Sequence, residues 1–309
     1  MRTPENVIYT DNGNAPVSKL VGTACSIGIQ SFISQVDFAN GVCTLHADWP
    51  LQSAIQNNDI EKAKEGGKRK ILVAVGGATF DTPSWKGCAD NLNAFVAALV
   101  DFVKEHKFDG IDIDWEDTTD LVYMGDSAKK EECYDAVAFL VNLTKKLRAS
   151  LPAPQYIITH APQPPYFDPA FYGGTYMQVM KLAGDAIDYL NIQYYNNESF
   201  VGTTGPEQTV KVAGTAGSSP YPTSIVGLVG QGLPVEKLLV GKPTSPENAG
   251  SGFLPVGEFC EDVVAPLVHK YGADFGGVMG WQLAQSPNST DLEYDWISTV
   301  ADALTGNAG

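Results

Sequence analysis

The stretch KFDGIDIDWE, residues 107–116, ends in a strict alternation of apolar and acidic side chains. Successive side chains of a β-strand point to opposite faces, so Asp112, Asp114 and Glu116 share one face and the apolar side chains share the other. Side chains at positions i and i+2 lie roughly 7 Å apart, so the three carboxylates repel one another, and burying them costs desolvation free energy. A buried strand would carry such a row only if the acids had a function or partners.

An edge strand with a solvated acidic face is the alternative interpretation. The flanking sequence favours burial, because an amphipathic helical pattern precedes the strand, Gly110 opens it without a side chain, and its apolar face contains a tryptophan. A strand of a parallel sheet is covered on both faces. Neighbouring carboxyls with coupled pKa values are what a general acid working near neutral pH requires.

Short runs rich in β-branched residues alternate with helical patterns along the whole chain, which predicts βα units around a parallel sheet. Eight runs are expected to be strands: Val7–Tyr9, Ile27–Ile33, Ile71–Val75, Gly110–Trp115, Tyr156–Thr159, Tyr189–Tyr194, Lys237–Val240 and Gly276–Trp281. Eight strands, each followed by a helix or a long loop, indicate a single (β/α)8 TIM barrel that occupies residues 1–309 as one domain. A doubly wound Rossmann sheet is the second possibility, although no GxGxxG motif follows the first run.

Apolar residues at helical spacing predict the helices between these runs. The clearest patterns cover Asn91–His106 and Cys133–Leu151, and two further patterns cover Glu258–Tyr271 and Trp296–Leu304. Together with the strands they complete the alternation that a barrel requires.

The composition limits the classes of partner. A net charge of −16 argues against nucleic acid and against an anionic membrane surface. No apolar run approaches the roughly 20 residues that a membrane-spanning helix needs. The four histidines and five cysteines show no ligand spacing, so we expect neither a metal nor a cofactor, and the spacing leaves open whether disulfides form.

The string DGIDIDWE, residues 109–116, resembles the DGxDxDxE signature of glycoside hydrolase family 18, the chitinases and endo-β-N-acetylglucosaminidases. The glycine and all three acids match. The resemblance implies that Glu116 is the proton donor, that Asp114 orients the substrate's acetamido group, and that Asp112 holds or exchanges a proton with Asp114. In a barrel of this kind the reactive residues lie where the strands end.

Two earlier strands carry further parts of the resemblance. Residues 74–77, AVGG, resemble the family's SxGG motif with Ala74 in place of the serine, and Gly77 becomes a candidate substrate contact. In the family that serine hydrogen-bonds the innermost aspartate, so its absence leaves open how the pKa of Asp112 is set. Tyr9 matches a tyrosine that plant-type and fungal chitinases place beside the same aspartate; a core tyrosine is the alternative.

The segment HAPQPPY, residues 160–166, is similar to an APQ-type segment of compact fungal and plant-type (class III) chitinases. This similarity makes Gln163 and Tyr166 candidates for sugar contacts. A proline-rich turn with a purely structural role is the alternative for both residues.

Residues 191–197, NIQYYNN, resemble the family's QxYN motif. The match implies that Tyr195 donates a hydrogen bond to the substrate's acetamido group, while Gln193 and Asn196 bind the sugar or position the acids. Trp281 resembles the tryptophan that floors the subsite of the reacting sugar, where a flat indole suits the apolar face of a pyranose. A buried tryptophan capping the barrel is the alternative.

The resemblance implies substrate-assisted hydrolysis of a β-1,4 bond after an N-acetylglucosamine unit, with the acetamido oxygen as nucleophile and no attacking protein carboxylate. Chitin or another N-acetylglucosamine-containing oligosaccharide is the expected substrate. An endo-β-N-acetylglucosaminidase cutting the chitobiose core of N-glycans is the second possibility, and a non-catalytic lectin the third. We expect a monomer. The family favours secretion, although a first strand near Asn6 leaves no room for a signal peptide.

Overall fold

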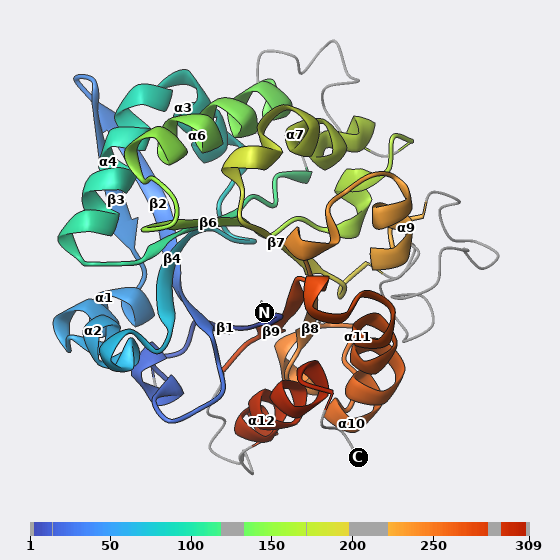
Figure 1. Cartoon of the computed structure of the whole chain (residues 1–309). Coiled ribbons are helices and arrows are strands. Elements are labelled where there is room, and N and C mark those ends of the chain that lie inside the picture. Colours follow the sequence, from blue (N-terminus) through green and yellow to red (C-terminus); the bar gives the residue numbers. More distant parts are fainter. Residues whose placement is uncertain are drawn as a thin grey trace.

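Eight parallel strands close into a barrel inside a layer of helices (Figure 1). The computed structural model describes residues 3–13, 15–118, 133–170, 172–197, 222–283 and 292–306. The barrel strands are β1 (Glu5–Thr10), β2 (Ile27–Ala39), β4 (Lys70–Gly76), β5 (Gly110–Asp114), β6 (Ile157–His160), β7 (Tyr189–Gln193), β8 (Leu238–Pro243) and β9 (Gly277–Trp281). Each of the eight expected runs overlaps one of these strands, and the predicted (β/α)8 barrel is confirmed.

Closure of the sheet depends on the first strand, which pairs with both the second and the last. Val7 of β1 lies opposite Ile27 of β2 on one side and opposite Met279 of β9 on the other, and both pairings are parallel. A doubly wound sheet is open and would leave its outer strands without these partners. The Rossmann alternative is therefore wrong.

The helices cover the outer face of the barrel (Figure 1). Their bounds are α1 (Trp49–Gln56), α2 (Asp59–Ala63), α3 (Thr82–Asp90), α4 (Leu92–Glu105), α6 (Ala136–Ser150), α7 (Thr175–Ala183), α9 (Ile225–Gly230), α10 (Val256–Phe259), α11 (Ala265–Tyr271) and α12 (Leu292–Leu304). The four expected helices correspond to α4, α6, α12 and the pair α10 and α11, which a π-helical turn at Cys260–Val264 connects. Helices α1, α2 and α9 are too short to give a clear helical pattern in the sequence.

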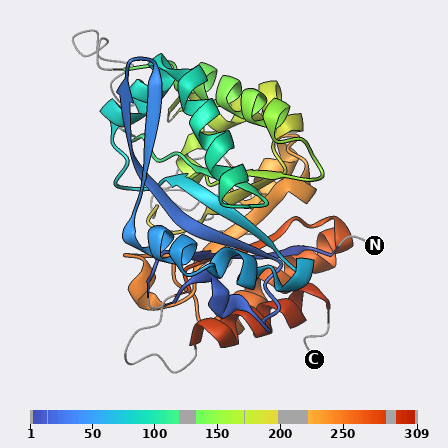
Figure 2. The ribbon, with the colours of Figure 1, turned by 90° about the vertical axis from the view of Figure 1, so that its left-hand side faces the viewer.

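A hairpin extends β2 beyond the expected strand and adds one antiparallel strand to the sheet. β2 continues to Ala39 instead of ending at Ile33, and β3 (Val42–Ala47) pairs with it. The two strands project as a long ribbon beside α3 and α4 (Figures 1 and 2). The sequence predicts a strand end at Ile33 because the apolar run ends there. In the structure, hydrogen bonds to β3 extend β2 to Ala39.

The barrel wall has an apolar outer face and a mixed inner face. On β5, Ile111 and Ile113 pack outward into the main core, whereas the alternating acid Asp112 lies inside. A smaller apolar cluster fills the interior and includes Tyr9, Ile29, Leu72, Leu239 and Met279. Gly110 lets β5 approach β6 closely, because a Cβ there would lie 1.9 Å from the carbonyl oxygen of Ile157.

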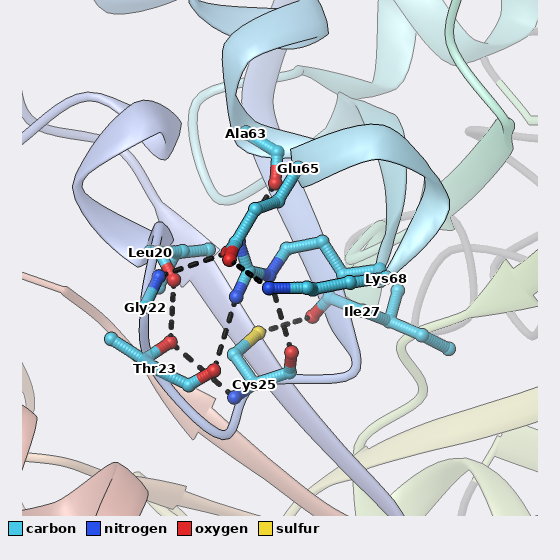
Figure 3. Close-up of polar contacts among 9 residues, drawn as sticks. Leu20, Gly22, Thr23, Cys25, Ile27, Ala63, Glu65 and Lys68 are labelled. Atoms are coloured by element: carbon cyan, nitrogen blue, oxygen red, sulfur yellow. Dashed lines mark hydrogen bonds and ion pairs between the residues drawn. The ribbon is translucent and has the colours of Figure 1, made fainter.

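A buried arginine connects the segments that lead into β2 and β4. Figure 3 labels residues of both segments, among them Thr23, Cys25, Ala63 and Glu65. The Arg69 side chain is 3% exposed and pairs with Glu65 at 3.2 Å. It also donates to three backbone carbonyls at distances of 2.8 to 3.2 Å, those of Thr23, Cys25 and Ala63. One guanidinium therefore satisfies acceptors from two separate segments, residues 23–25 and 63–65.

The structure joins no two of the five cysteines by a disulfide bond, which answers the question that their spacing leaves open. Burial raises the pKa of the Cys25 thiol to about 12. Within the described residues, no three His, Cys, Asp or Glu side chains are grouped so that they could hold a metal ion. None of the helices in that same part of the chain is long and apolar enough to cross a membrane.

We expect Arg69→Met to destabilise the fold by about 3 kcal/mol, because three carbonyls lose their donor and Glu65 loses a cation. Lys68→Met is the matched control. Its ammonium pairs with the same Glu65, but the side chain is 71% exposed, so its loss should cost less than about 1 kcal/mol. Urea denaturation followed by circular dichroism measures both variants. Equal losses would show that the carbonyl contacts of Arg69 contribute nothing.

Candidate active site

Asp112 is fully buried inside the barrel and accepts hydrogen bonds from three other strands. The Tyr9 hydroxyl on β1 donates to Oδ2 at 2.7 Å, while the Thr159 hydroxyl on β6 and the Asn191 amide on β7 donate to Oδ1. Burial raises the pKa of Asp112, whereas these three hydrogen bonds lower it. Neutral donors therefore stabilise the carboxylate form in the interior.

The structure explains how Asp112 is held although Ala74 lacks a hydroxyl. In the sheet, Asp112 lies between Ala74 of β4 and Thr159 of β6, which are its paired residues on the two sides. A serine at position 74 would approach from β4, and the Thr159 hydroxyl approaches from β6. In this structure the hydroxyl donor to Asp112 from a paired strand therefore comes from β6.

Gln193 joins the two outer acids of the row. Its Nε2 lies 3.0 Å from Oδ1 of Asp114 and 3.0 Å from Oε1 of Glu116, and 2.9 Å from the carbonyl oxygen of Ala161. Asp114 and Glu116 also hydrogen-bond each other. The end of β7 thus fixes both carboxyls at the end of β5.

The pKa values of these acids are linked. Burial, the negative charges of Glu116 and Asp112, and the hydrogen bond to Glu116 together raise the pKa of Asp114 well above its usual range. Burial also raises the pKa of Glu116, but hydrogen bonds from Gln193 and Asp114 lower it. Asp114 therefore stays protonated and donates a hydrogen bond to Glu116. The acids titrate as a coupled set.

A cavity of about 400 Å³ lies at the carboxyl ends of the strands, above this acid row. It brings together eight of the residues singled out in the sequence: Gly77, Asp114, Glu116, Gln163, Gln193, Tyr195, Asn196 and Trp281. Asp112 and Tyr9 lie beneath it, both buried. The interior position of Tyr9, hydrogen-bonded to Asp112, is the one that the resemblance implies.

Tyr195, just after β7, and Trp281, the last residue of β9, both line the cavity. Burial and the charges of the three acids raise the pKa of Tyr195 well above its usual range, so its phenol stays protonated as a donor. The Trp281 ring is partly exposed, lies 5.6 Å from the Tyr9 ring, and is anchored by a 3.0 Å hydrogen bond to the Asn248 carbonyl. Trp281 is therefore a wall of the cavity and not a fully buried cap.

Tyr166 lies elsewhere, and the expected sugar contact is not met. It is fully buried, its hydroxyl lies 3.1 Å from that of Thr118, and its ring packs edge-on against Trp115 at 5.4 Å. Trp115 belongs to the core outside the barrel. The short 3₁₀ turn at Pro164–Phe167 directs the ring into that core, while Gln163 just before it reaches the cavity.

The sequence analysis does not identify several residues of the site. Thr159 and Asn191, the donors to Asp112, could have been found from strand alternation, since Asn191 shares a face with Gln193. Asp11 and Asp48 also line the cavity. Asp48 follows the unexpected β3, so no strand end marks it in the sequence.

The family model of the glycosyl hydrolases family 18 matches residues 9–252. This range starts at Tyr9 and contains the whole acid row together with Gln193 and Tyr195. The chain belongs to glycosyl hydrolases family 18. The predicted resemblance is thereby confirmed, and the family membership agrees with the barrel.

Named relatives in this family are chitinases. Chitinase ChiA of Flavobacterium johnsoniae is 26% identical over 279 residues, 79% of this chain and 17% of that protein. Chitinase Chi52 of Paenibacillus xylanexedens is 24% identical over 96% of this chain and 58% of that protein. The chain thus spans less than two thirds of the length of these relatives. A solved chitinase structure from Pseudoalteromonas aurantia is similar over 97% of this chain and 99% of that one, with a TM-score of 0.74 and 28% identity.

The raised pKa of Asp114 predicts a pH-dependent cost to stability. The unfolded chain ionises this carboxyl near pH 3.8, and the folded chain only at higher pH, so the cost is absent in acid and grows as the pH rises. We expect Asp114→Asn to be more stable than the wild type by about 1 to 3 kcal/mol at pH 8 and equally stable at pH 4. Urea denaturation across this pH range measures the difference.

The control for this prediction is Asp101→Asn on the exposed side of α4, which should show no such pH-dependent gain. A gain shared by both variants would reflect the lower net charge of the protein. An Asp114→Asn variant that is less stable at every pH would show that the acid row is not strained by its burial.

Proposed function

We propose that the protein hydrolyses β-1,4 bonds that follow an N-acetylglucosamine unit in chitin. The observation that carries the proposal is the hydrogen-bonded pair of Asp114 and Glu116 at the floor of a cavity with the Tyr195 phenol and the Trp281 ring on its walls. Family membership and chitinase-named relatives support the same reaction class.

Glu116 is the general acid and then the base in this proposal. Burial raises its pKa, and the proton of its hydrogen bond with Asp114 is the one that it passes to the leaving oxygen. As a carboxylate it then activates water. Asp114 orients the acetamido group and stabilises the positive charge that develops there. Asp112, which lies beneath Asp114, holds or exchanges a proton with it.

The close spacing of the acids argues that neither attacks the sugar. Retaining hydrolases with a protein nucleophile hold their two carboxyls about 5 to 5.5 Å apart, with the sugar between them, and inverting enzymes hold them about 6.5 to 9.5 Å apart. Asp114 and Glu116 instead hydrogen-bond each other and share one donor, Gln193. This arrangement fits attack by the substrate's own acetamido oxygen.

The remaining groups of the cavity suit an N-acetylated sugar. The protonated phenol of Tyr195 can donate to the acetamido oxygen, and the Trp281 ring can lie against the apolar face of the pyranose. Gly77, Gln163, Gln193 and Asn196 line the same space as contacts for the sugar. We also propose that residues 1–309 act as one catalytic domain and as a monomer, without nucleic acid or membrane as a partner.

Glu116→Gln should lower kcat on a chitin oligosaccharide by roughly 10²-fold to 10⁴-fold while oligosaccharide binding persists. The amide keeps the shape of the carboxyl and its contact with Gln193, but its N–H protons are too weakly acidic to transfer. Product formation measured by mass spectrometry and binding measured by calorimetry separate the two effects. The control is Asp101→Asn, which should retain wild-type turnover.

Near wild-type turnover by Glu116→Gln would mean that another group protonates the leaving oxygen. If the wild type cut a high-mannose glycopeptide and left chitin oligosaccharides intact, the substrate would be an N-glycan core instead. The first result would change the assignment of the general acid, and the second would change the substrate.

The first product of hydrolysis should have the β configuration. Attack by the acetamido oxygen inverts the anomeric carbon once and attack by water inverts it again, so the net result is retention. Proton NMR during the first minutes of the reaction identifies the anomer. A fully deacetylated oligosaccharide should not be cut, because it carries no oxygen to attack. An initial α product would assign the attack to water activated by a second carboxyl.

A further inference from the structure

The orientation of the Trp281 ring depends on a hydrogen bond to a loop outside the acid row. An indole has a single hydrogen-bond donor, and that of Trp281 reaches the backbone carbonyl of Asn248 at 3.0 Å. The ring also packs edge-on against Tyr9 at 5.6 Å and lies tilted by 40° against Phe32 at 6.0 Å. These two aromatic contacts support one part of the ring, and the hydrogen bond fixes its rotation about the side-chain bonds.

The side chain of Asn248 holds the carbonyl that accepts this hydrogen bond. Asn248 ends a short 3₁₀ turn, Pro246–Asn248, that follows β8, so its carbonyl is not held by a neighbouring strand. Its Nδ2 donates to the Thr244 hydroxyl at 3.0 Å and to the carbonyl oxygen of Gln282 at 3.2 Å. Asn248 therefore contacts the indole through its backbone and the residue after Trp281 through its amide.

Thr244 connects this arrangement to the barrel. It follows β8 directly, is 4% exposed, and donates its backbone N–H to the carbonyl oxygen of Trp281 at 2.8 Å. Its hydroxyl donates to the carbonyl oxygen of Gln282 at 2.6 Å. Thr244 thus holds the main chain of Trp281, Asn248 holds the ring, and the Asn248 amide joins the two.

The same loop also reaches the other side of the cavity. The backbone N–H groups of Gly250 and Ser251 donate to Oδ1 of Asn196 at 2.9 and 3.1 Å. A general loosening of the loop would therefore affect Asn196 as well as Trp281. The two routes differ in one respect, because an effect that passes through the indole requires the indole to be present.

We propose that Asn248 is a positioning residue for Trp281, whose amide holds the carbonyl that orients the indole against the reacting sugar. This role rests on the proposed hydrolysis at Glu116. Asn248 is not among the described residues that line the cavity, so its influence on the sugar passes through the ring. A displacement of about 1 Å at a reacting centre can cost roughly 10²-fold in rate, so the orientation of the ring affects turnover as well as binding.

A double-mutant cycle on a chitin oligosaccharide tests this role. Asn248→Ala should lower kcat/KM by roughly tenfold, because the amide hydrogen bonds that hold the acceptor of the indole are lost. In a Trp281→Ala background the same substitution should change kcat/KM by less than about twofold, since the two residues act as one unit. Asn248→Asp keeps the size of the side chain but only accepts hydrogen bonds when ionised, so it should lose at least as much as Asn248→Ala.

Glu247→Ala is the matched control, since Glu247 is the exposed neighbour of Asn248 in the same turn and should keep wild-type kcat/KM when replaced. Urea denaturation of each variant establishes that folded proteins are compared. An equal loss from Asn248→Ala with and without the indole would assign the effect to the loop and overturn the positioning role. Wild-type kcat/KM in Asn248→Ala would overturn it as well.

A measurement without substrate separates this role from the proposed function. Proton–nitrogen NMR resolves the indole N–H groups, and Trp281→Ala identifies the signal of Trp281 by its loss. In Asn248→Ala this N–H should exchange with solvent roughly tenfold faster. The Trp115 indole, which donates to the Tyr134 hydroxyl at 2.7 Å, is the internal control and should be unchanged.

Unchanged exchange of the Trp281 indole in Asn248→Ala would refute the positioning role. If the wild type cut no chitin oligosaccharide, the proposed function would fail instead. The exchange rates would then still show whether Asn248 holds the ring.

Discussion

The burial of a row of carboxyls inside a closed barrel is the constraint on which the rest of the site depends. Moving an unpaired carboxylate out of water is costly, and three on one strand add mutual repulsion. Neutral hydrogen-bond donors and protons shared between the acids offset this cost. Among the described residues, no cation contributes to the pKa values of these acids. Tyr9, Thr159 and Asn191 surround the innermost acid, and Gln193 spans the outer two.

These donors come from β1, β6 and β7. β6 pairs with β5 directly and β7 lies beside β6, whereas the donor from β1 reaches β5 because the sheet closes. The pairings of β1 with β2 and β9 complete that closure, and the Tyr9 hydroxyl reaches Asp112 across the interior. Close approach of strands follows from glycine at the start of β5 and from Gly76, where a Cβ would lie 2.2 Å from the carbonyl oxygen of Asp114. Fold stability and the electrostatics of the site are thus properties of the same contacts.

Sequence reasoning reaches the features that local patterns encode. Alternation places Asp112 and Asp114 on one face of β5, with Glu116 two residues beyond its end, and runs of β-branched residues mark all eight barrel strands. It does not reach features that depend on tertiary contacts. The fixation of Asp112 by Thr159, despite Ala74, requires the order of strands in the sheet. The direction of the Tyr166 ring is set by packing on Trp115, and β3 is defined by hydrogen bonds to β2.

The two acid groups of the cavity handle charge in different ways, and the difference bears on function. The row on β5 is surrounded by donors within the protein, so its proton balance is set before a substrate arrives. Backbone N–H groups hold Asp48, but Asp11 has its carboxyl neighbour as its described side-chain partner and raises the pKa of Asp114 through its charge. Loss of the negative charge on Asp11 would therefore lower the pKa of Asp114. The charge at the cavity wall and the proton balance at its floor are linked by this electrostatic interaction.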